Sequence, residues 1–174
     1  PHLKTFRDGW RTLRFFLMCS PKWLFLLPGF LLVLFGVLAA SLALPGVKIG
    51  SATFDAHTLL FGSLAFILGY QAIVFAIMTK AFAVNEGLMP KDRRLEGFFR
   101  VVTLERGLIF GGASFVGGFV LLGAAVFQWL QAGFGVLDYS YTMRWVIPGA
   151  TLSALGFQTM LFSFFISMMG ITRK

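Results

Sequence analysis

Four stretches of the chain are apolar almost without interruption. They run from about Trp23 to Leu44, from Thr58 to Phe82, from Gly107 to Leu130 and from Trp145 to Ile171. Each has the roughly 20 residues that a helix needs to cross a hydrocarbon core about 30 Å thick. Lys80, near the end of the second stretch, is the only charged residue in them, and its long side chain can reach the headgroups. The pattern predicts four transmembrane helices.

A different pattern precedes the first span. Between Leu3 and Leu17, apolar residues recur at a spacing of three and four, with basic residues on the other side. This arrangement is typical of an amphipathic helix lying in the membrane interface, and Pro21 ends it. We therefore predict an all-α membrane protein with a juxtamembrane helix over residues 1–20 and a four-helix transmembrane domain over 21–174. The mixed polarity of residues 95–104 is compatible with a second interfacial helix, with Phe98, Phe99 and Val102 facing inward.

Composition supports this class of protein. Hydrophobic residues make up 57% of the 174 residues and charged residues 13%, whereas soluble domains have about 25% charged residues. The mean hydropathy of +0.83 excludes a water-soluble globular domain. Cys19 is the single cysteine, which excludes a disulfide scaffold.

The basic residues divide unequally between the two ends of the predicted spans. Lys48 and Arg144 lie in the loops on one side, and the other thirteen lie on the opposite side. Since cytoplasmic loops carry the excess of Lys and Arg, we predict that both termini and the central loop are cytoplasmic. The net charge of +8 then indicates attraction to anionic lipid headgroups, and no nucleic-acid partner is expected.

Several basic residues of the cytoplasmic side are candidates for binding a lipid phosphate, since arginine forks suit phosphate oxygens. The candidates are Arg7, Arg11, Arg14, Lys22, Arg93 and Arg94. Two interpretations stay open: general attraction to headgroups, or a site for a specific phospholipid-like molecule.

Few other residues suggest chemistry. Gln71 and Gln158, near the middle of their spans, either join helices by hydrogen bonds or face a lipid-phosphate or sugar pathway. Gly107 and Gly111 form a G-x-x-x-G pair that favours close helix packing. Loop acids such as Asp55 are expected to be solvated or paired with neighbouring bases. No catalytic residue and no metal site is predicted, because neither His2 nor His57 has other ligands at a suitable spacing.

A weak internal repeat relates the two halves. Residues 68–71 (Leu-Gly-Tyr-Gln) match residues 155–158 (Leu-Gly-Phe-Gln) at an offset of 87, and at the same offset Gly36 matches Gly123. Such a repeat would place two helical hairpins in the same direction across the membrane.

Longer motifs resemble a known family. Residues 5–15 (TFRDGWRTLRF), 20–25 (SPKWLF), 86–90 (EGLMP) and 104–108 (LERGL) are similar to the C-terminal membrane region of bacterial family 2 glycosyltransferases of the dolichyl- or polyprenyl-phosphate type. The pair Gly133-Phe134-Gly135 and Leu137-Asp138 belongs to the same likeness. The resemblance covers the whole chain.

The resemblance implies a specific role. Such enzymes carry a cytoplasmic catalytic domain whose Asp-x-Asp motif holds a nucleotide sugar with Mg or Mn, and they transfer the sugar to a polyprenyl phosphate. This chain contains no Asp-x-Asp, no catalytic site and no cofactor site of its own, and it opens at Pro1. We therefore expect the anchoring and acceptor-presenting domain of a longer enzyme in the bacterial inner (cytoplasmic) membrane.

Two alternatives differ in class. The chain could be a non-catalytic accessory subunit of a larger membrane complex, or a small translocator of lipid-linked sugars. The expected partners are membrane lipids, including polyprenyl phosphate under the first hypothesis. A homo-oligomer and a larger membrane complex both stay open.

Overall fold

The computed structural model describes residues 9–10, 12, 22–50, 52–90, 93, 97–98 and 102–171, and the account below concerns these residues. They form the helices α2 (Leu27–Ala43), α3 (Ala56–Asn85), α5 (Leu104–Gln131) and α6 (Tyr139–Ile171). A π-helical turn, η1 (Lys22–Leu26), leads into α2. Each of the four is long and apolar enough to cross a membrane, which confirms the all-α class and the four predicted spans.

The loop between α2 and α3 contains a small hairpin. Its strands β1 (Lys48–Ile49) and β2 (Ala52–Thr53) pair antiparallel, with Ile49 opposite Ala52. Gly50 lies in the turn with a φ of +60°, a conformation that glycine adopts without steric cost. The predicted juxtamembrane helix over 1–20 lies largely outside the described residues. Within this segment the structure describes Gly9, Trp10 and Thr12, and all three are helical.

The fourth span begins earlier than the sequence predicts. We expected it from Trp145, but α6 begins at Tyr139, so the loop after α5 covers only residues 132–138. The Asp138 carboxylate accepts a hydrogen bond of 2.9 Å from the Tyr141 backbone N–H and caps the new first turn. Pro148 lies inside α6. Because proline has no N–H, the carbonyl of Arg144 lacks its usual helical donor there.

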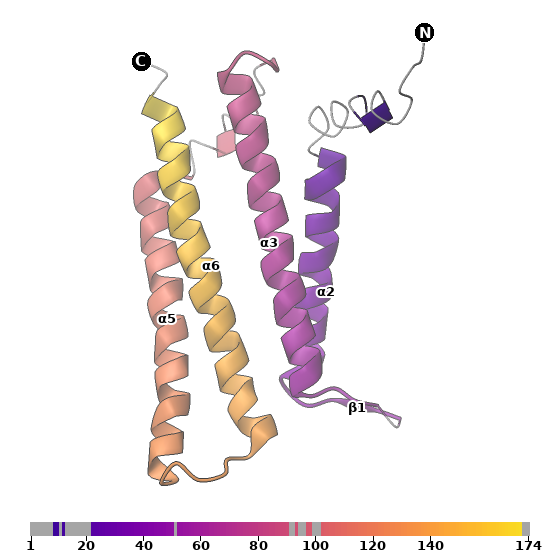
Figure 1. The fold of residues 1–174 in the computed structure, drawn as a ribbon, viewed down its shortest axis with the longest axis vertical. Helices are drawn as coiled ribbons and strands as arrows, with labels where there is room; N and C mark the ends of the chain where they lie inside the picture. The colour runs from indigo at the N-terminus through magenta and orange to yellow at the C-terminus, as the bar shows by residue number, and fades with distance from the viewer. Residues whose placement is uncertain are drawn as a thin grey trace.

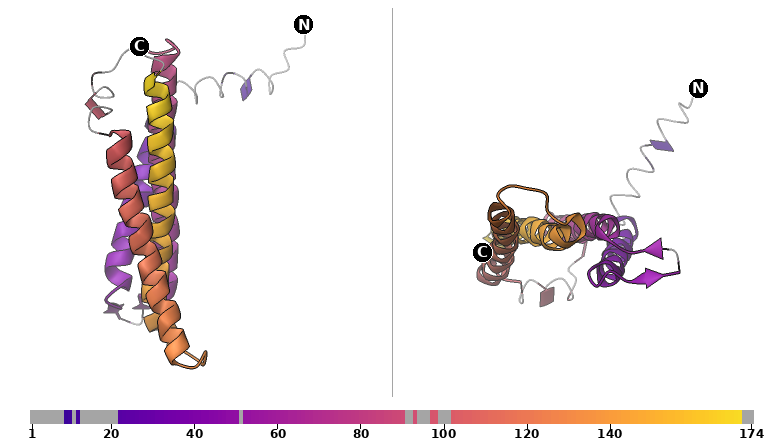
Figure 2. Two further views of the ribbon diagram at one scale, coloured as in Figure 1. Left: turned by 90° about the vertical axis from the view of Figure 1, so that its left-hand side faces the viewer. Right: turned by 90° about the horizontal axis from the view of Figure 1, so that it is seen from below.

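The helices stand in a row rather than in a square bundle (Figure 1). Extensive contacts join α2 to α3 and α5 to α6, and a smaller contact joins α3 to α6. The order across the row is therefore α2, α3, α6, α5, as the end-on view in Figure 2 shows. Each hairpin is one closely packed pair, and the two pairs meet along α3 and α6.

Glycines make both hairpins possible, because they let the backbones approach closely. A Cβ on Gly36 would lie 2.6 Å from the Gly62 carbonyl oxygen, and one on Gly69 would lie 2.6 Å from that of Gly29. In the second hairpin, a Cβ on Gly156 would lie 2.6 Å from the Gly111 carbonyl oxygen. The facing pairs are Gly29 and Gly69, Gly36 and Gly62, Gly111 and Gly156, and Gly118 and Gly149.

The spacing of the packing glycines is the same in both hairpins, which supports the repeat. The alignment of α2 with α5, however, differs from the predicted one. Within every helix the two glycines that face a glycine of the partner helix are seven residues apart. The offset of 87 holds between α3 and α6, where Gly69 corresponds to Gly156. It is wrong between α2 and α5: Gly36 corresponds to Gly118, whereas a Cβ on Gly123 would meet nothing within 4 Å.

Hydroxyl groups join the two hairpins. Tyr70 of α3 hydrogen-bonds Thr159 of α6 with 2.6 Å between the oxygens, and Ser63 hydrogen-bonds Thr151. Thr159 and Thr151 also donate to the carbonyl four residues earlier in α6. These four hydroxyl groups are thus satisfied without water, as the membrane interior requires.

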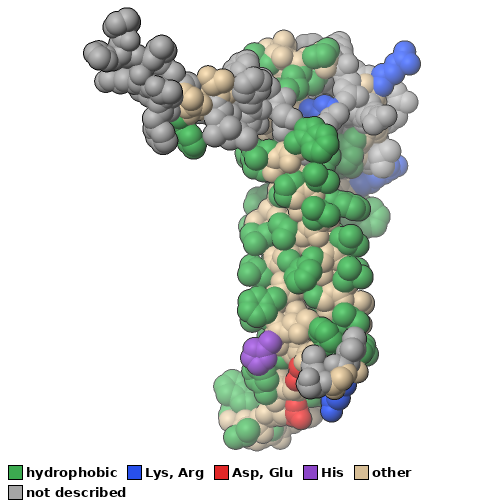
Figure 3. Space-filling model, turned by 90° about the vertical axis from the view of Figure 1, so that its right-hand side faces the viewer, with side chains coloured by type: hydrophobic (Ala, Val, Ile, Leu, Met, Phe, Trp, Pro, Cys, Tyr) green, Lys and Arg blue, Asp and Glu red, His purple; other side chains and the backbone are tan. Residues whose placement is uncertain are grey.

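The surface divides into a long apolar column and two polar ends (Figure 3). Phe30, Phe61 and Phe110 are among the many large apolar side chains exposed along the helices. An apolar surface of this extent fits a lipid environment. We call the end with the central loop the basic end, and the end with the residue 44–55 and 132–138 loops the neutral end.

Candidate functional site

The basic end is built by the loop that follows α3. Helix α3 ends at Asn85, and Gly87, with a φ of +71°, turns the chain back. The Leu88 N–H then donates to the Ala83 carbonyl at 2.9 Å, which closes the helix end. Ala81 and Val84 of α3 form a small buried cluster, and Met89 of the loop and Met169 of α6 pack against it. The start of the loop therefore packs back onto the end of α3.

A second contact places the later part of the central loop. The Phe98 ring lies against Phe162 of α6, with centroids 6.5 Å apart, and its backbone carbonyl accepts from the Val102 N–H at 2.9 Å. Such a bond is typical of one helical turn, which agrees with part of the predicted interfacial helix over 95–104, and Phe98 faces inward as predicted. The end of the prediction is wrong, because Thr103 is extended and Leu104 already begins α5.

Helix α5 begins at this end in close contact with α6. Thr103 caps it by accepting a hydrogen bond from the Arg106 backbone N–H at 3.4 Å. Gly107 packs directly on Ser163, which is buried and donates to the Thr159 carbonyl. The predicted packing role of Gly107 and Gly111 is confirmed, since both lie against α6.

Basic side chains surround this platform. Arg93 and Arg106 are exposed, and Lys80 is partly exposed near the end of α3. Lys22 begins η1 at the same end. Of the other residues predicted to bind a lipid phosphate, Arg7, Arg11, Arg14 and Arg94 lie outside the described residues.

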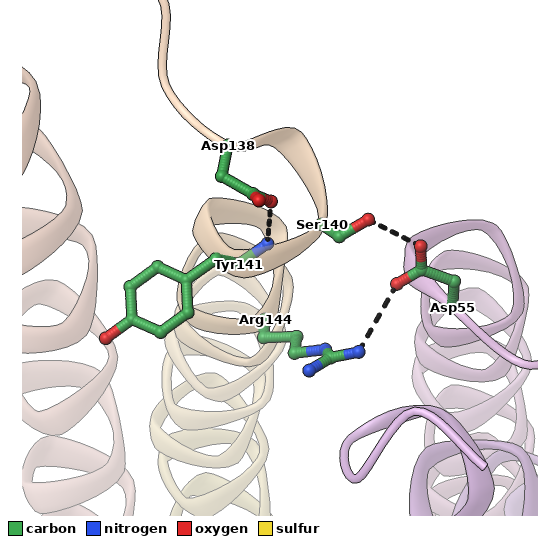
Figure 4. A network of polar contacts seen from close by, with 5 residues as sticks. All are labelled: Asp55, Asp138, Ser140, Tyr141 and Arg144. Carbon is green, nitrogen blue, oxygen red and sulfur yellow. Dashed lines mark hydrogen bonds and ion pairs between the residues drawn. The ribbon is translucent and has the colours of Figure 1, made fainter.

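The opposite end carries a polar cluster that joins the two hairpins (Figure 4). Asp55, directly before α3, accepts a hydrogen bond of 2.5 Å from the Ser140 hydroxyl of α6. Its other oxygen lies 3.6 Å from Nη2 of Arg144, also of α6. The Arg144 guanidinium in turn rests on Gly46, where a Cβ would lie 2.5 Å from Nη2. Asp55 therefore ties the start of α6 to the α2–α3 hairpin.

This environment favours the ionised form of Asp55. The Ser140 hydrogen bond is the main cause that lowers the pKa of Asp55 below its ordinary value of 3.8, and Arg144 and His57 act in the same direction. Of the two alternatives expected for Asp55, solvation or pairing with a base, the structure shows pairing. The partner, 89 residues away in sequence, was not foreseen.

Charges outside the spans reinforce the difference between the ends. By sequence, Lys48 and Arg144 at the neutral end are balanced by Asp55 and Asp138. The formal charge of +8 is therefore carried entirely by segments of the other end. Within the described residues, Arg144 is neutralised by direct pairing.

The two intramembrane glutamines differ in environment. Gln71 is exposed on the surface of α3. Gln158 is partly buried, and its Oε1 atom is buried without a hydrogen-bond partner among the described residues. Tyr70 and Thr159, the direct neighbours of these glutamines in sequence, form the hydrogen bond between the hairpins. Sequence reasoning missed this pair because a Tyr and a Thr in a span are common.

Comparison with known proteins agrees with the resemblance in sequence. The family described as the glycosyltransferase family 2 C-terminal transmembrane region matches residues 77–170. The low-salt glycan biosynthesis hexosyltransferase Agl6 of the archaeon Haloferax volcanii is 33% identical over 170 residues. The aligned part covers 97% of this chain and 40% of that protein, so the chain spans well under half of this relative. No solved structure matches the chain.

Proposed function

Because the chain belongs to the C-terminal transmembrane region of family 2 glycosyltransferases, we propose that it anchors such an enzyme and presents its lipid acceptor. The proposed acceptor is a polyprenyl phosphate, which receives a sugar from a nucleotide sugar. The proposed catalytic domain, with Mg or Mn, lies outside this sequence. The hexosyltransferase name of the archaeal relative is consistent with sugar transfer.

The observation that carries the proposal is the segregation of charge. The whole formal charge of +8 belongs to the basic end, where Arg93 and Arg106 are exposed beside a loop whose start packs back onto the end of α3. Clustered arginines bind phosphate oxygens by charge-assisted hydrogen bonds. An amphipathic segment at the same end would hold a catalytic domain close to the headgroups. Under this proposal the basic end faces the cytoplasm.

The accessory-subunit hypothesis makes the opposite prediction about binding. A subunit that only packs against partners through its apolar surface has no need of a phosphate-binding basic end. The translocator hypothesis requires polar groups along a pathway. Gln71, exposed on α3, and Gln158, beside the seam, do not converge with other polar groups in the described residues.

The test is acceptor binding by the full-length protein in lipid nanodiscs. Changing Arg7, Arg11 and Arg14 to Gln should weaken binding of a radiolabelled polyprenyl phosphate at least tenfold, since a hydrogen bond to a charged group contributes about 1.5–3 kcal/mol. Lys48→Gln is the matched control, because it removes an exposed cation at the neutral end. Membrane insertion should be unchanged in all variants. Equal affinity of the triple variant and the wild type would contradict the proposal.

A further inference from the structure

A hollow of about 400 Å³ lies between the end of α5 and the start of α6, at the neutral end of the row. Its walls include Leu122, Val126 and Trp129 of α5, and Tyr139, Met143 and Val146 of α6. None of the residues that line it is charged. From Leu122 to Trp129 of α5, at about 1.5 Å per residue, the hollow follows the helix for about 10 Å.

We propose that this hollow binds the distal part of the hydrocarbon chain of a long polyprenyl phosphate whose phosphate is held at the basic end. The inference rests on the proposed function and adds the length of the acceptor chain to it. An apolar hollow at this depth of a membrane helix pair suits a hydrocarbon chain and disfavours a charged or sugar ligand.

Distance makes the site selective for long chains. Arg106 and Leu122 are sixteen residues apart in α5, which corresponds to about 24 Å along the helix. An isoprene unit adds four carbon–carbon bonds of about 1.5 Å, so three units span at most about 18 Å. A farnesyl chain is thus too short to reach from the basic end into the hollow, and a chain of about eleven units is long enough.

Contacts with neighbouring elements support both walls of the hollow. Tyr139 and Met143 face the hollow, while Ser140 and Arg144 of the same turns are tied to Asp55. On α5, the Trp129 ring packs edge-on against Phe134 at 4.9 Å. These contacts support the α6 wall through Asp55 and the α5 wall through Phe134. A site with supported walls binds more tightly than one that a ligand must order.

The experiment compares two acceptors on the full-length protein in nanodiscs. Dissociation constants are measured for an eleven-unit polyprenyl phosphate and for farnesyl phosphate. Val126→Trp fills the hollow, and Val116→Trp is its control, because both valines lie on α5 and are 60% exposed but only Val126 lines the hollow. Val126→Trp should weaken binding of the long acceptor about tenfold and leave that of farnesyl phosphate unchanged. Val116→Trp should change neither.

Each of the other outcomes would overturn the inference, and each would indicate a different cause. An equal loss for both acceptors would show that Val126→Trp disturbs the bundle rather than chain binding. No loss for either would mean that bulk lipid or a second copy of the chain fills the hollow. Failure of the wild type to bind either phosphate would overturn the proposed function as well, which distinguishes that failure from the others.

Discussion

At the scale of single residues, the absence of a side chain determines how the hairpins pack. Gly118 leaves no space for a methyl group, because a Cβ there would lie 2.5 Å from the Gly149 carbonyl oxygen and 2.6 Å from the Ser153 nitrogen. Gly112, on the same helix, has nothing within 4 Å of the same position. A substitution at Gly118 therefore tests helix packing, whereas a substitution at Gly112 tests helix propensity alone.

We predict opposite effects of alanine at these positions. Gly118→Ala should lower the free energy of unfolding by about 1–3 kcal/mol, since it forces α5 and α6 apart. Gly112→Ala should leave it unchanged or raise it by up to about 1 kcal/mol, because alanine is the better helix former. Titration of detergent micelles with a denaturing detergent measures both. Equal stabilities of the two variants would contradict the close glycine contact.

Some of these residue roles could be predicted from sequence and others could not. The G-x-x-x-G spacing of Gly107 and Gly111 identified two packing glycines correctly. Glycines without a contact, such as Gly123, look the same in sequence as glycines with one. For this reason the predicted alignment of α2 with α5 chose Gly123 instead of Gly118. Whether a glycine contacts the partner helix depends on how the two helices cross, and amino-acid composition does not determine that crossing.

At the scale of elements, Asp55 holds α3 and α6 together at the neutral end. Two contacts, the Ser140 hydroxyl and the Arg144 guanidinium, stabilise its carboxylate and lower its pKa below 3.8. A group whose pKa is lower in the folded state stabilises the fold above its unfolded pKa, and the stabilisation is lost as pH falls through the folded value.

We therefore predict a pH-dependent difference between the wild type and Asp55→Asn. At neutral pH the variant should unfold at a lower temperature, because Asn cannot pair with Arg144 as an ion. As the pH falls through 3.8 and below, the difference should shrink, since the wild-type carboxylate becomes neutral. Thermal unfolding in detergent across this pH range measures it.

Asp138→Asn is the matched control at the same end. Asn can still accept the hydrogen bond from the Tyr141 N–H and cap α6. Its unfolding temperature should follow that of the wild type at every pH. A constant difference between Asp55→Asn and the wild type down to pH 2 would contradict the role of the ionised carboxylate.

Element boundaries followed the hydrophobic pattern where nothing interrupts it. The predicted first span, Trp23 to Leu44, matches the observed Trp23–Ala43 closely. The fourth span was predicted to begin six residues too late, because Arg144 and the polar residues before it are typical of loops. Here Arg144 is neutralised by Asp55, and Asp138 caps the first turn of α6. Asp55 lies 89 residues away in sequence, so local sequence does not reveal this pairing.

At the scale of the whole molecule, two glycine-packed hairpins form a row in which α3 and α6 are central (Figure 2). The order of the row was not predicted, because the hydroxyl groups that join α3 and α6 belong to residue types that are common in membrane spans. The contrast between the two ends was predictable, because charge is excluded from the spans. The predicted orientation in the membrane rests on that contrast alone.

The last prediction concerns this orientation. Thirteen basic residues lie at or near the basic end and two at the neutral end. Each basic residue near an anionic cytoplasmic leaflet contributes about 1 kcal/mol, so the basic end should face the cytoplasm. In a Cys19→Ser background, Val136→Cys reports on the neutral end and Leu88→Cys on the basic end, since these side chains are 102% and 74% exposed.

A membrane-impermeant maleimide applied to intact cells should label Val136→Cys and spare Leu88→Cys. Permeabilised cells should show equal labelling of both, which controls for reactivity. The reverse pattern in intact cells would place the basic end outside and remove the physical basis for acceptor phosphate binding on the cytoplasmic side. Labelling of both positions in intact cells would indicate a mixed orientation, which a charge difference of this size should prevent.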